Sequence, residues 1–140
     1  MSTKSVSIPK HSIMIRSTED SYRRIIINND YKTRSNYIDF FVAGYKESDG
    51  KEIIECLSEN EPIELRRDTS YPYDQFAVSI WTSDAIKLGY VPEIISSLIS
   101  YKLEDKNKKV SAVIKKIKLN AHDECKIEIR VFVDKIKKIN

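Results

Sequence analysis

Cysteine and histidine are scarce in this chain of 140 residues, with two of each. A structural zinc site takes four such ligands at short spacing, and neither Cys56 nor Cys125 lies near a second cysteine. His122 stands three residues before Cys125, which still leaves too few ligands. The sequence therefore predicts no metal site. Two reduced thiols are expected, because the inside of a cell keeps thiols reduced, and a Cys56–Cys125 disulfide is the alternative.

Long apolar runs are also missing. No stretch approaches the roughly 20 apolar residues that a membrane-spanning helix needs, and Met1–Lys10 lacks the apolar core of a signal peptide. We therefore expect a soluble cytoplasmic protein with no membrane partner. The composition agrees, because 41% hydrophobic and 32% charged residues are typical of a globular domain. The net charge of +3 permits polyanion binding without demanding it.

Catalytic motifs are absent too. Three glycines leave little room for a phosphate-binding loop, and no HExxH helix occurs. Asp68 and Asp74 are a conceivable metal pair for nuclease chemistry, but two-metal sites need several clustered acids. A nucleophile made from Cys125 and His122 has no evident orienting partner. The sequence therefore predicts a protein that is not an enzyme and uses no cofactor.

Short strand-like stretches separated by turn signals fill most of the chain. Helical spacing occurs only in Lys51–Leu57 and in Pro92–Leu103, where Pro92 suits a first helical position. The stretches that favour strands are His11–Arg16, Tyr22–Asn28, Tyr37–Tyr45, Pro62–Arg67, Phe76–Thr82, Ala85–Val91, Val110–Leu119 and Lys126–Val133. A tally of about six to eight strands and two helices predicts a mostly antiparallel β-barrel or sandwich with added helices.

Three motifs from Val42 onward resemble the HIRAN domain. They are Val42-Ala43-Gly44, then RDTSYPYDQFAV over Arg67–Val78, then LGYVP over Leu88–Pro92, which leads into the second helix. The resemblance covers about Asp39–Ile117 in both order and spacing. It implies a mostly β, α+β fold with two helices, which is a modified OB-like antiparallel β-barrel. The expected organisation is an N-terminal extension (1–38, a partly flexible arm with extra strands), a HIRAN-like domain (39–133) and a basic tail (134–140).

The resemblance also implies a ligand. In a eukaryotic fork-remodelling enzyme the family binds single-stranded DNA at its free 3′ end, while bacterial and phage relatives often occur alone. Tyr73 is then expected to stack on the terminal base and Asp74 to accept a hydrogen bond from the 3′-hydroxyl. Lys46 takes the place of the family's basic residue, with the charge but without the fork geometry of arginine. The departures from the family pattern are Glu47, Tyr71 and Phe76, which replace an aromatic residue and two asparagines.

The residue types point to the same chemistry without the family. Single-strand binding needs exposed aromatic rings beside positive charge, and each stacked base contributes about 1–3 kcal/mol. An aspartate repels phosphate but accepts a hydrogen bond from a hydroxyl, so it fits a strand end better than a continuous strand. The predicted nucleic-acid-binding residues are Lys46, Arg67, Tyr71, Tyr73, Asp74, Lys87 and Tyr90, with Arg66 as a further candidate phosphate partner.

Structural roles for the same residues remain open. Pro72 would then set a turn, Asp74 would cap backbone N–H groups and Tyr73 would pack on the barrel. Gly89 is expected to allow close packing rather than to contact a ligand, and Trp81 to lie on a sheet face.

Two other functions also remain open. A protein-interaction module, such as a phage-encoded inhibitor or adaptor on a HIRAN-like scaffold, would use the acidic stretch Glu47–Glu64 and the departures from the family pattern. A module that binds a nucleotide or nucleotide-like signal is the third reading. The stretch Lys102–Lys118 and the tail are rich in lysine, whereas Glu47–Glu64 is acidic. We therefore expect a surface that is basic on one side and acidic on the other.

Overall fold

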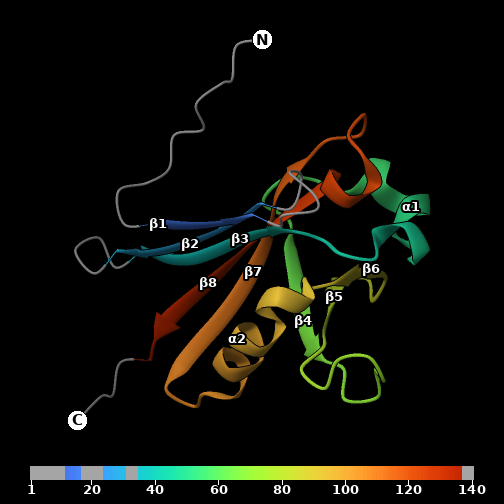
Figure 1. Cartoon of the computed structure of the whole chain (residues 1–140). Coiled ribbons are helices and arrows are strands. Elements are labelled where there is room, and N and C mark those ends of the chain that lie inside the picture. The colour runs from blue at the N-terminus through green and yellow to red at the C-terminus, as the bar shows by residue number, and fades with distance from the viewer. Residues whose placement is uncertain (1–11, 17–23, 31–34, 137–140) are drawn as a thin grey trace.

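The computed structural model describes residues 12–16, 24–30 and 35–136 (Figure 1). These residues form one eight-stranded sheet in the order β1-β2-β3-β8-β7-β4-β5-β6, with every neighbouring pair antiparallel. The strands are β1 (Ser12–Arg16), β2 (Arg24–Asp30), β3 (Ser35–Phe41), β4 (Pro62–Arg67), β5 (Val78–Thr82), β6 (Lys87–Tyr90), β7 (Lys108–Ile117) and β8 (Ile127–Lys135). The helices are α1 (Gly50–Ile53) and α2 (Glu93–Glu104), with 3-10 turns at Tyr45–Glu47, Ile54–Cys56 and Asp123–Cys125.

The predicted strands all form, and the differences lie at their ends. The strand predicted to run to Tyr45 stops at Phe41, because Gly44 adopts a left-handed backbone (φ 70°) and starts a 3-10 turn. The hairpin after β5 turns through Ala85, which has φ 61°, so its return strand begins at Lys87. The predicted first helix is one α-turn followed by a 3-10 turn. The predicted arm at residues 1–10 and the end of the predicted tail at residues 137–140 lie outside the described residues.

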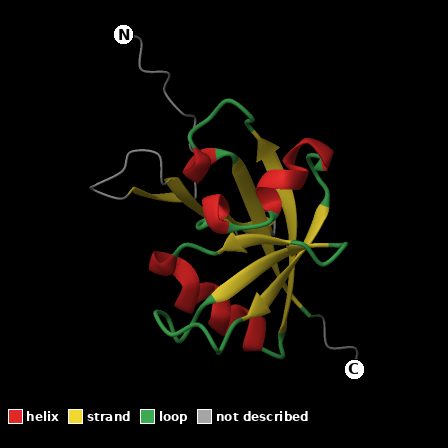
Figure 2. Cartoon of the chain, turned by 90° about the vertical axis from the view of Figure 1, so that its right-hand side faces the viewer, coloured by secondary structure: helices red, strands yellow, loops and turns green. Residues whose placement is uncertain are grey.

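A backbone bridge closes the curled sheet into a barrel. Ala43, just after β3, exchanges two hydrogen bonds with Tyr90 at the end of β6, with N···O distances of 2.9 and 2.8 Å. We call this contact the closing bridge. It joins the two ends of the strand set β3-β8-β7-β4-β5-β6, whereas β1 and β2 extend the sheet beyond β3. Figure 2, turned by 90°, shows the strands crossing one another at steep angles, as a curled sheet requires.

Gly89 makes the closing bridge possible, as the sequence predicted. Its φ is 148°, and a Cβ there would lie 2.3 Å from the carbonyl oxygen of Ala43 and 2.6 Å from Val42 Cγ1. Only glycine allows two backbones to approach this closely. The role of Gly89 is therefore to hold Tyr90 against the turn that follows β3.

The core lies inside the barrel and under α2. Fully buried side chains from opposite walls meet there, among them Phe40, Ile80, Leu88 and Ile129. Helix α2 packs on β7 and β5 and contributes Ile95 and Ile99, which are 2% and 0% exposed. Because burial of such a side chain contributes about 1.5–3 kcal/mol, α2 is anchored firmly enough to serve as a support for the neighbouring loop.

A largely buried ion-pair network on β2, β3, β7 and β8 was not predicted. Asp39 is 1% exposed, and its carboxylate accepts from Arg130 Nε at 2.8 Å and from Lys115 Nζ at 2.9 Å. Glu128, 2% exposed, pairs with Arg24 at 3.3 Å. The hydrogen bond and charge of Asp39 raise the pKa of Arg130, although partial burial opposes this. The network spans four strands and so links them on that face.

Candidate functional site

Three tyrosines stand together where the β4–β5 loop meets the end of β6, and we call them the tyrosine cluster. Tyr71 stacks on Tyr90 with ring centroids 4.9 Å apart and an interplanar angle of 27°. Tyr73 meets the ring of Tyr71 edge to face at 5.6 Å. The side chain of Tyr73 is 81% exposed, so it does not pack on the barrel. The cluster therefore presents one exposed ring, Tyr73, beside two half-buried rings that stack on each other.

Asp68 ties the cluster to the loop. Its Oδ1 accepts from the hydroxyl of Ser70 at 2.7 Å and from the Ser70 backbone N–H at 3.3 Å, which is the local turn that aspartate favours. Its Oδ2 accepts from the hydroxyl of Tyr90 at 3.0 Å. The hydrogen bond from the Ser70 hydroxyl is the largest cause that lowers the pKa of Asp68, and Tyr90 and Lys87 lower it further against the effect of burial. Asp68 therefore stays charged and holds Tyr90 in place.

Lys87 lies at the cluster, but its charge is already paired. Its ammonium lies 4.1 Å from the centroid of the Tyr90 ring, donates to the Tyr90 hydroxyl, and stands 3.9 Å from Asp68 Oδ2. Such a cation over an aromatic face is attracted by the ring quadrupole. Lys87 therefore stiffens Tyr90, and a phosphate would have to compete with Asp68 for it.

The two arginines at the end of β4 are paired as well. Arg67 forms an ion pair with Glu104, 37 residues away on α2, and donates to the backbone oxygen of Gln75 at 3.1 Å. Arg66 lies 3.1 Å from Glu64 and 4.6 Å from the centroid of the Trp81 ring. Arg67 thus connects both ends of the β4–β5 loop to α2, which is a structural task beside the predicted contact with phosphate.

Asp74 holds the loop against α2. Its Oδ1 accepts from the backbone N–H of Phe76 at 2.8 Å, and its Oδ2 accepts from the hydroxyl of Ser96 at 2.6 Å. This matches the capping role weighed as the alternative to ligand binding. An ionised carboxylate has about four lone-pair sites, so two of them stay available to a further donor.

The closing bridge brings the turn that contains Lys46 next to β6. Lys46 lies in the 3-10 turn that starts after Gly44, and Gly44 stands against the Tyr90 ring, with 3.8 Å between Tyr90 Cδ2 and the place of a Cβ on Gly44. Lys46 and its neighbour Glu47 are both exposed. Within the described residues, Lys46 forms no ion pair, unlike Arg66, Arg67 and Lys87.

Two departures from the family pattern make ring contacts. Tyr71 builds the tyrosine cluster by stacking on Tyr90, and the Phe76 ring lies 5.6 Å from the ring of Tyr101 on α2. Both replace asparagine with an aromatic side chain, so this loop presents more aromatic surface than the family pattern implies.

Sequence reasoning missed three residues that support the cluster. Asp68 could have been found, because an aspartate two residues before a serine is a common turn signal. Ser96 and Glu104 could not, because they reach the loop from α2 and no local pattern connects them to it.

Other features bear on the remaining predictions. Cys56 and Cys125 form no disulfide with each other. None of the helices in the described ranges has the length and hydrophobicity to cross a bilayer. Trp81 lies in β5, as expected, and its indole N–H donates to the hydroxyl of Ser79 at 2.7 Å.

Comparisons with known proteins agree with this fold. The family model described as the HIRAN domain matches residues 35–135. The crystal structure of the HIRAN domain of human HLTF is 18% identical in sequence, with a TM-score of 0.53 over 71% of this chain and 76% of that one. A protein from Lactobacillus plantarum is 19% identical, with a TM-score of 0.56 over 69% of this chain and 91% of that one. No curated protein matches. The predicted family and the mostly β, OB-like fold with two helices are confirmed.

Proposed function

The chain belongs to the HIRAN domain family, and from this premise we propose that it is a non-catalytic module that binds nucleic acid through the tyrosine cluster. The proposed ligand is single-stranded DNA, with a preference for a free 3′ end. The observation that carries the proposal is the open aromatic surface, with Tyr73 81% exposed. The residues proposed to contact the strand are Lys46, Arg67, Tyr71, Tyr73, Asp74, Lys87 and Tyr90.

The tyrosine cluster suits bases better than phosphates. Base stacking on an aromatic ring contributes about 1–3 kcal/mol and tolerates any sequence, because every base has a flat face. The cations nearest the rings are paired with carboxylates, so they supply little net positive potential. We therefore propose that Tyr73 and the Tyr71–Tyr90 stack hold one or two bases, with Lys46 as the phosphate partner.

The preference for a 3′ end rests on Asp74. Its carboxylate stands beside Tyr73 and keeps about two free lone-pair sites after its bonds to Phe76 and Ser96. A 3′-hydroxyl would donate to one of them, whereas an internal or terminal phosphate would be repelled by the charge.

The binding test uses fluorescence anisotropy with 5′-labelled oligonucleotides at low salt. Tyr73→Ala should weaken binding by about five- to 150-fold, which corresponds to about 1–3 kcal/mol for one stacked base. Tyr101→Ala is the matched control, because Tyr101 is also an exposed tyrosine (62%) but lies outside the tyrosine cluster. The absence of binding to any oligonucleotide would rule out the proposal.

The 3′-end test compares oligonucleotides that end in a hydroxyl or a phosphate. The wild-type chain should bind the hydroxyl end more tightly, and Asp74→Asn should reduce that difference. Ser96→Ala is the control, because it removes a structural partner of Asp74 and leaves the carboxylate in place. Equal binding of both ends by the wild type would reject the end preference but not the binding itself.

A protein-interaction module is the second candidate, because α2 exposes apolar side chains. Ile94 and Tyr101, one i, i+7 pair on one helix face, are 63% and 62% exposed, and Phe76 extends this apolar surface. A pull-down after nuclease treatment, with Ile94→Asp as the comparison, tests this reading. A stoichiometric protein that the wild type retains and the variant loses would favour it.

A further inference from the structure

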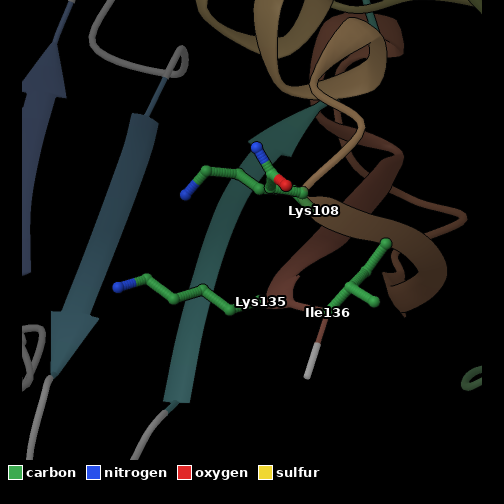
Figure 3. Close-up of a pocket in the computed structure, with 4 residues that line it drawn as sticks. Lys108, Lys135 and Ile136 are labelled. Atoms are coloured by element: carbon green, nitrogen blue, oxygen red, sulfur yellow. The ribbon is translucent and has the colours of Figure 1, made fainter. Parts of the chain in front are cut away.

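Two lysines face each other at the end of the barrel where β7 begins and β8 ends. Lys108 is the first residue of β7, and its cross-strand partner is Lys135, the last residue of β8. Figure 3 shows both side chains extending in the same direction from adjacent strands. With Asn107 and Ile136 they line a hollow of about 260 Å³. We call Lys108 and Lys135 the lysine pair.

The lysine pair has no compensating negative charge in the described part of the chain. Neither ammonium lies within ion-pairing distance of a carboxylate there. By contrast, six other cations are paired, namely Arg24, Arg66, Arg67, Lys87, Lys115 and Arg130. Like charges that stand directly opposite each other in a sheet repel and cost stability. The lysine pair is therefore a place where a bound anion would remove an unfavourable interaction.

The acids that are close in the sequence have other roles. Asp134 is the cross-strand partner of Lys109, and both are next to the lysine pair in sequence, so they point to the opposite face of the sheet. The face of the lysine pair continues instead into Val133, which is buried, and its cross-strand partner Val110, which is partly buried. Asp105 accepts the backbone N–H of Asn107 at 2.9 Å and so stabilises the turn before β7.

The size of the hollow also suits an anion of moderate size. Its volume of about 260 Å³ exceeds that of a single phosphate group, and it is open to solvent, so a phosphodiester could enter it. Asn107 adds an exposed amide beside the two ammonium groups. Two point charges with rotatable donors are a common way to hold a phosphate without reading a base.

We propose that the lysine pair binds a phosphodiester of a nucleic acid, as a second contact separate from the tyrosine cluster. This inference rests on the proposed function, because it assumes that the chain binds nucleic acid. It assigns the stacking of bases to the tyrosine cluster and part of the contact with the backbone to β7 and β8. The shared chemistry is a phosphate group, so free inorganic phosphate is the competing source that the experiment must separate.

The experiment measures how binding of a labelled single-stranded oligonucleotide depends on salt. Loss of one phosphate contact lowers the slope of log K against log salt by about 0.7 for a single strand. The double variant Lys108→Gln/Lys135→Gln should show this drop. The matched control is Lys116→Gln/Lys118→Gln, which removes the same charge from two exposed lysines at the other end of β7. The control should keep the wild-type slope.

A second arm separates the two sources of phosphate. Inorganic phosphate is titrated into the isotope-labelled chain at constant ionic strength, and the backbone amides of the lysine pair are followed by NMR. Shifts with phosphate but no change of slope in the double variant would mean a site for free phosphate, and would overturn the proposal. A slope that falls equally in the double variant and the control would overturn it too, because it would reflect net charge alone.

The outcomes separate this inference from the proposed function. If Tyr73→Ala weakens binding and the double variant behaves like wild type, the lysine pair has no role and the tyrosine cluster keeps its own. If no oligonucleotide binds the wild type, both proposals are overturned. Support requires that the double variant loses slope while Tyr73→Ala loses affinity with its slope intact.

Discussion

Replacing Gly89 by alanine tests whether the closing bridge holds the barrel and the site together. A Cβ at this position would lie 2.3 Å from the carbonyl oxygen of Ala43, a backbone atom that cannot turn aside. The backbones must then separate, and the two hydrogen bonds between Ala43 and Tyr90 are lost or lengthened. Gly89→Ala should therefore destabilise the fold and displace Tyr90 from Asp68.

The expected magnitude follows from three contributions. Two backbone hydrogen bonds at about 0.5–1.5 kcal/mol each give about 1–3 kcal/mol. A residue with a side chain held at φ 148° adds about 1–3 kcal/mol of strain. The smaller conformational freedom of unfolded alanine offsets about 0.4–1 kcal/mol. The free energy of unfolding should fall by about 2–5 kcal/mol, and the melting temperature by about 6–15 °C at about 3 °C per kcal/mol.

Urea and thermal unfolding, followed by circular dichroism and by Trp81 fluorescence, measure this change. Gly44→Ala is the matched control, because Gly44 also has a left-handed backbone (φ 70°) but a Cβ there meets nothing closer than 3.8 Å. It should cost about 1 kcal/mol, the penalty for an L-residue in that conformation. A Gly89→Ala variant as stable as Gly44→Ala would refute the argument from the closing bridge.

Three further predictions concern charged side chains. Asp39→Asn should lower the free energy of unfolding, measured in urea, by about 2 kcal/mol. Breaking a fully buried ion pair costs about 3–5 kcal/mol, and the cost here is smaller because Lys115 is 30% exposed. An unchanged free energy of unfolding would contradict a structural role for Asp39. The pKa of Asp68 lies below its ordinary 3.8, so the stabilisation that its charge gives the fold is present above that pH and is lost as the pH falls through the lowered pKa. The urea concentration at the unfolding midpoint should therefore fall at acid pH, and Asp68→Asn should make this fall smaller. An equal fall in the variant would count against the Asp68 contacts. Lys108→Gln/Lys135→Gln should raise the stability of the free chain at low salt by about 0.2–1 kcal/mol, an increase that salt removes; a decrease would show that the lysines do not repel.

Much of this fold could be predicted from local pattern. Alternation of apolar and polar residues located β4 and β5, and strand-like composition located β7 and β8. Helical spacing located α2 to within one residue at each end. The error at β3 has a physical cause, because the apolar run continues to Tyr45 while the backbone turns at Gly44. Tyr45 is buried at 3% exposure in that turn, so its apolar character reports burial and not a strand.

The candidate site was predictable in its aromatic part and much less so in its charges. The spacing of Tyr71 and Tyr73 around Pro72 placed two aromatic rings in one loop, and they do lie together. The pairing of Arg67 with Glu104 depends on how α2 crosses the barrel, which no local pattern encodes. The sequence therefore indicated which kinds of side chain the site contains, whereas only the structure showed which charged side chains are already paired.

The number of cations without a carboxylate partner determines how strongly salt should weaken the binding of nucleic acid. A cation that leaves a carboxylate to contact a phosphate gives little net counterion release, because the freed carboxylate takes up a cation in place of the one that leaves the phosphate. Arg67 and Lys87 belong to that class, so binding at the tyrosine cluster alone should depend weakly on salt. A steep salt dependence would have to come from cations without such partners, and the lysine pair and Lys46 are the ones that the proposals assign to phosphate. The slope of log K against log salt, measured on the wild-type chain, thus shows how much of the binding comes from phosphate contacts and how much from stacking, before any variant is made.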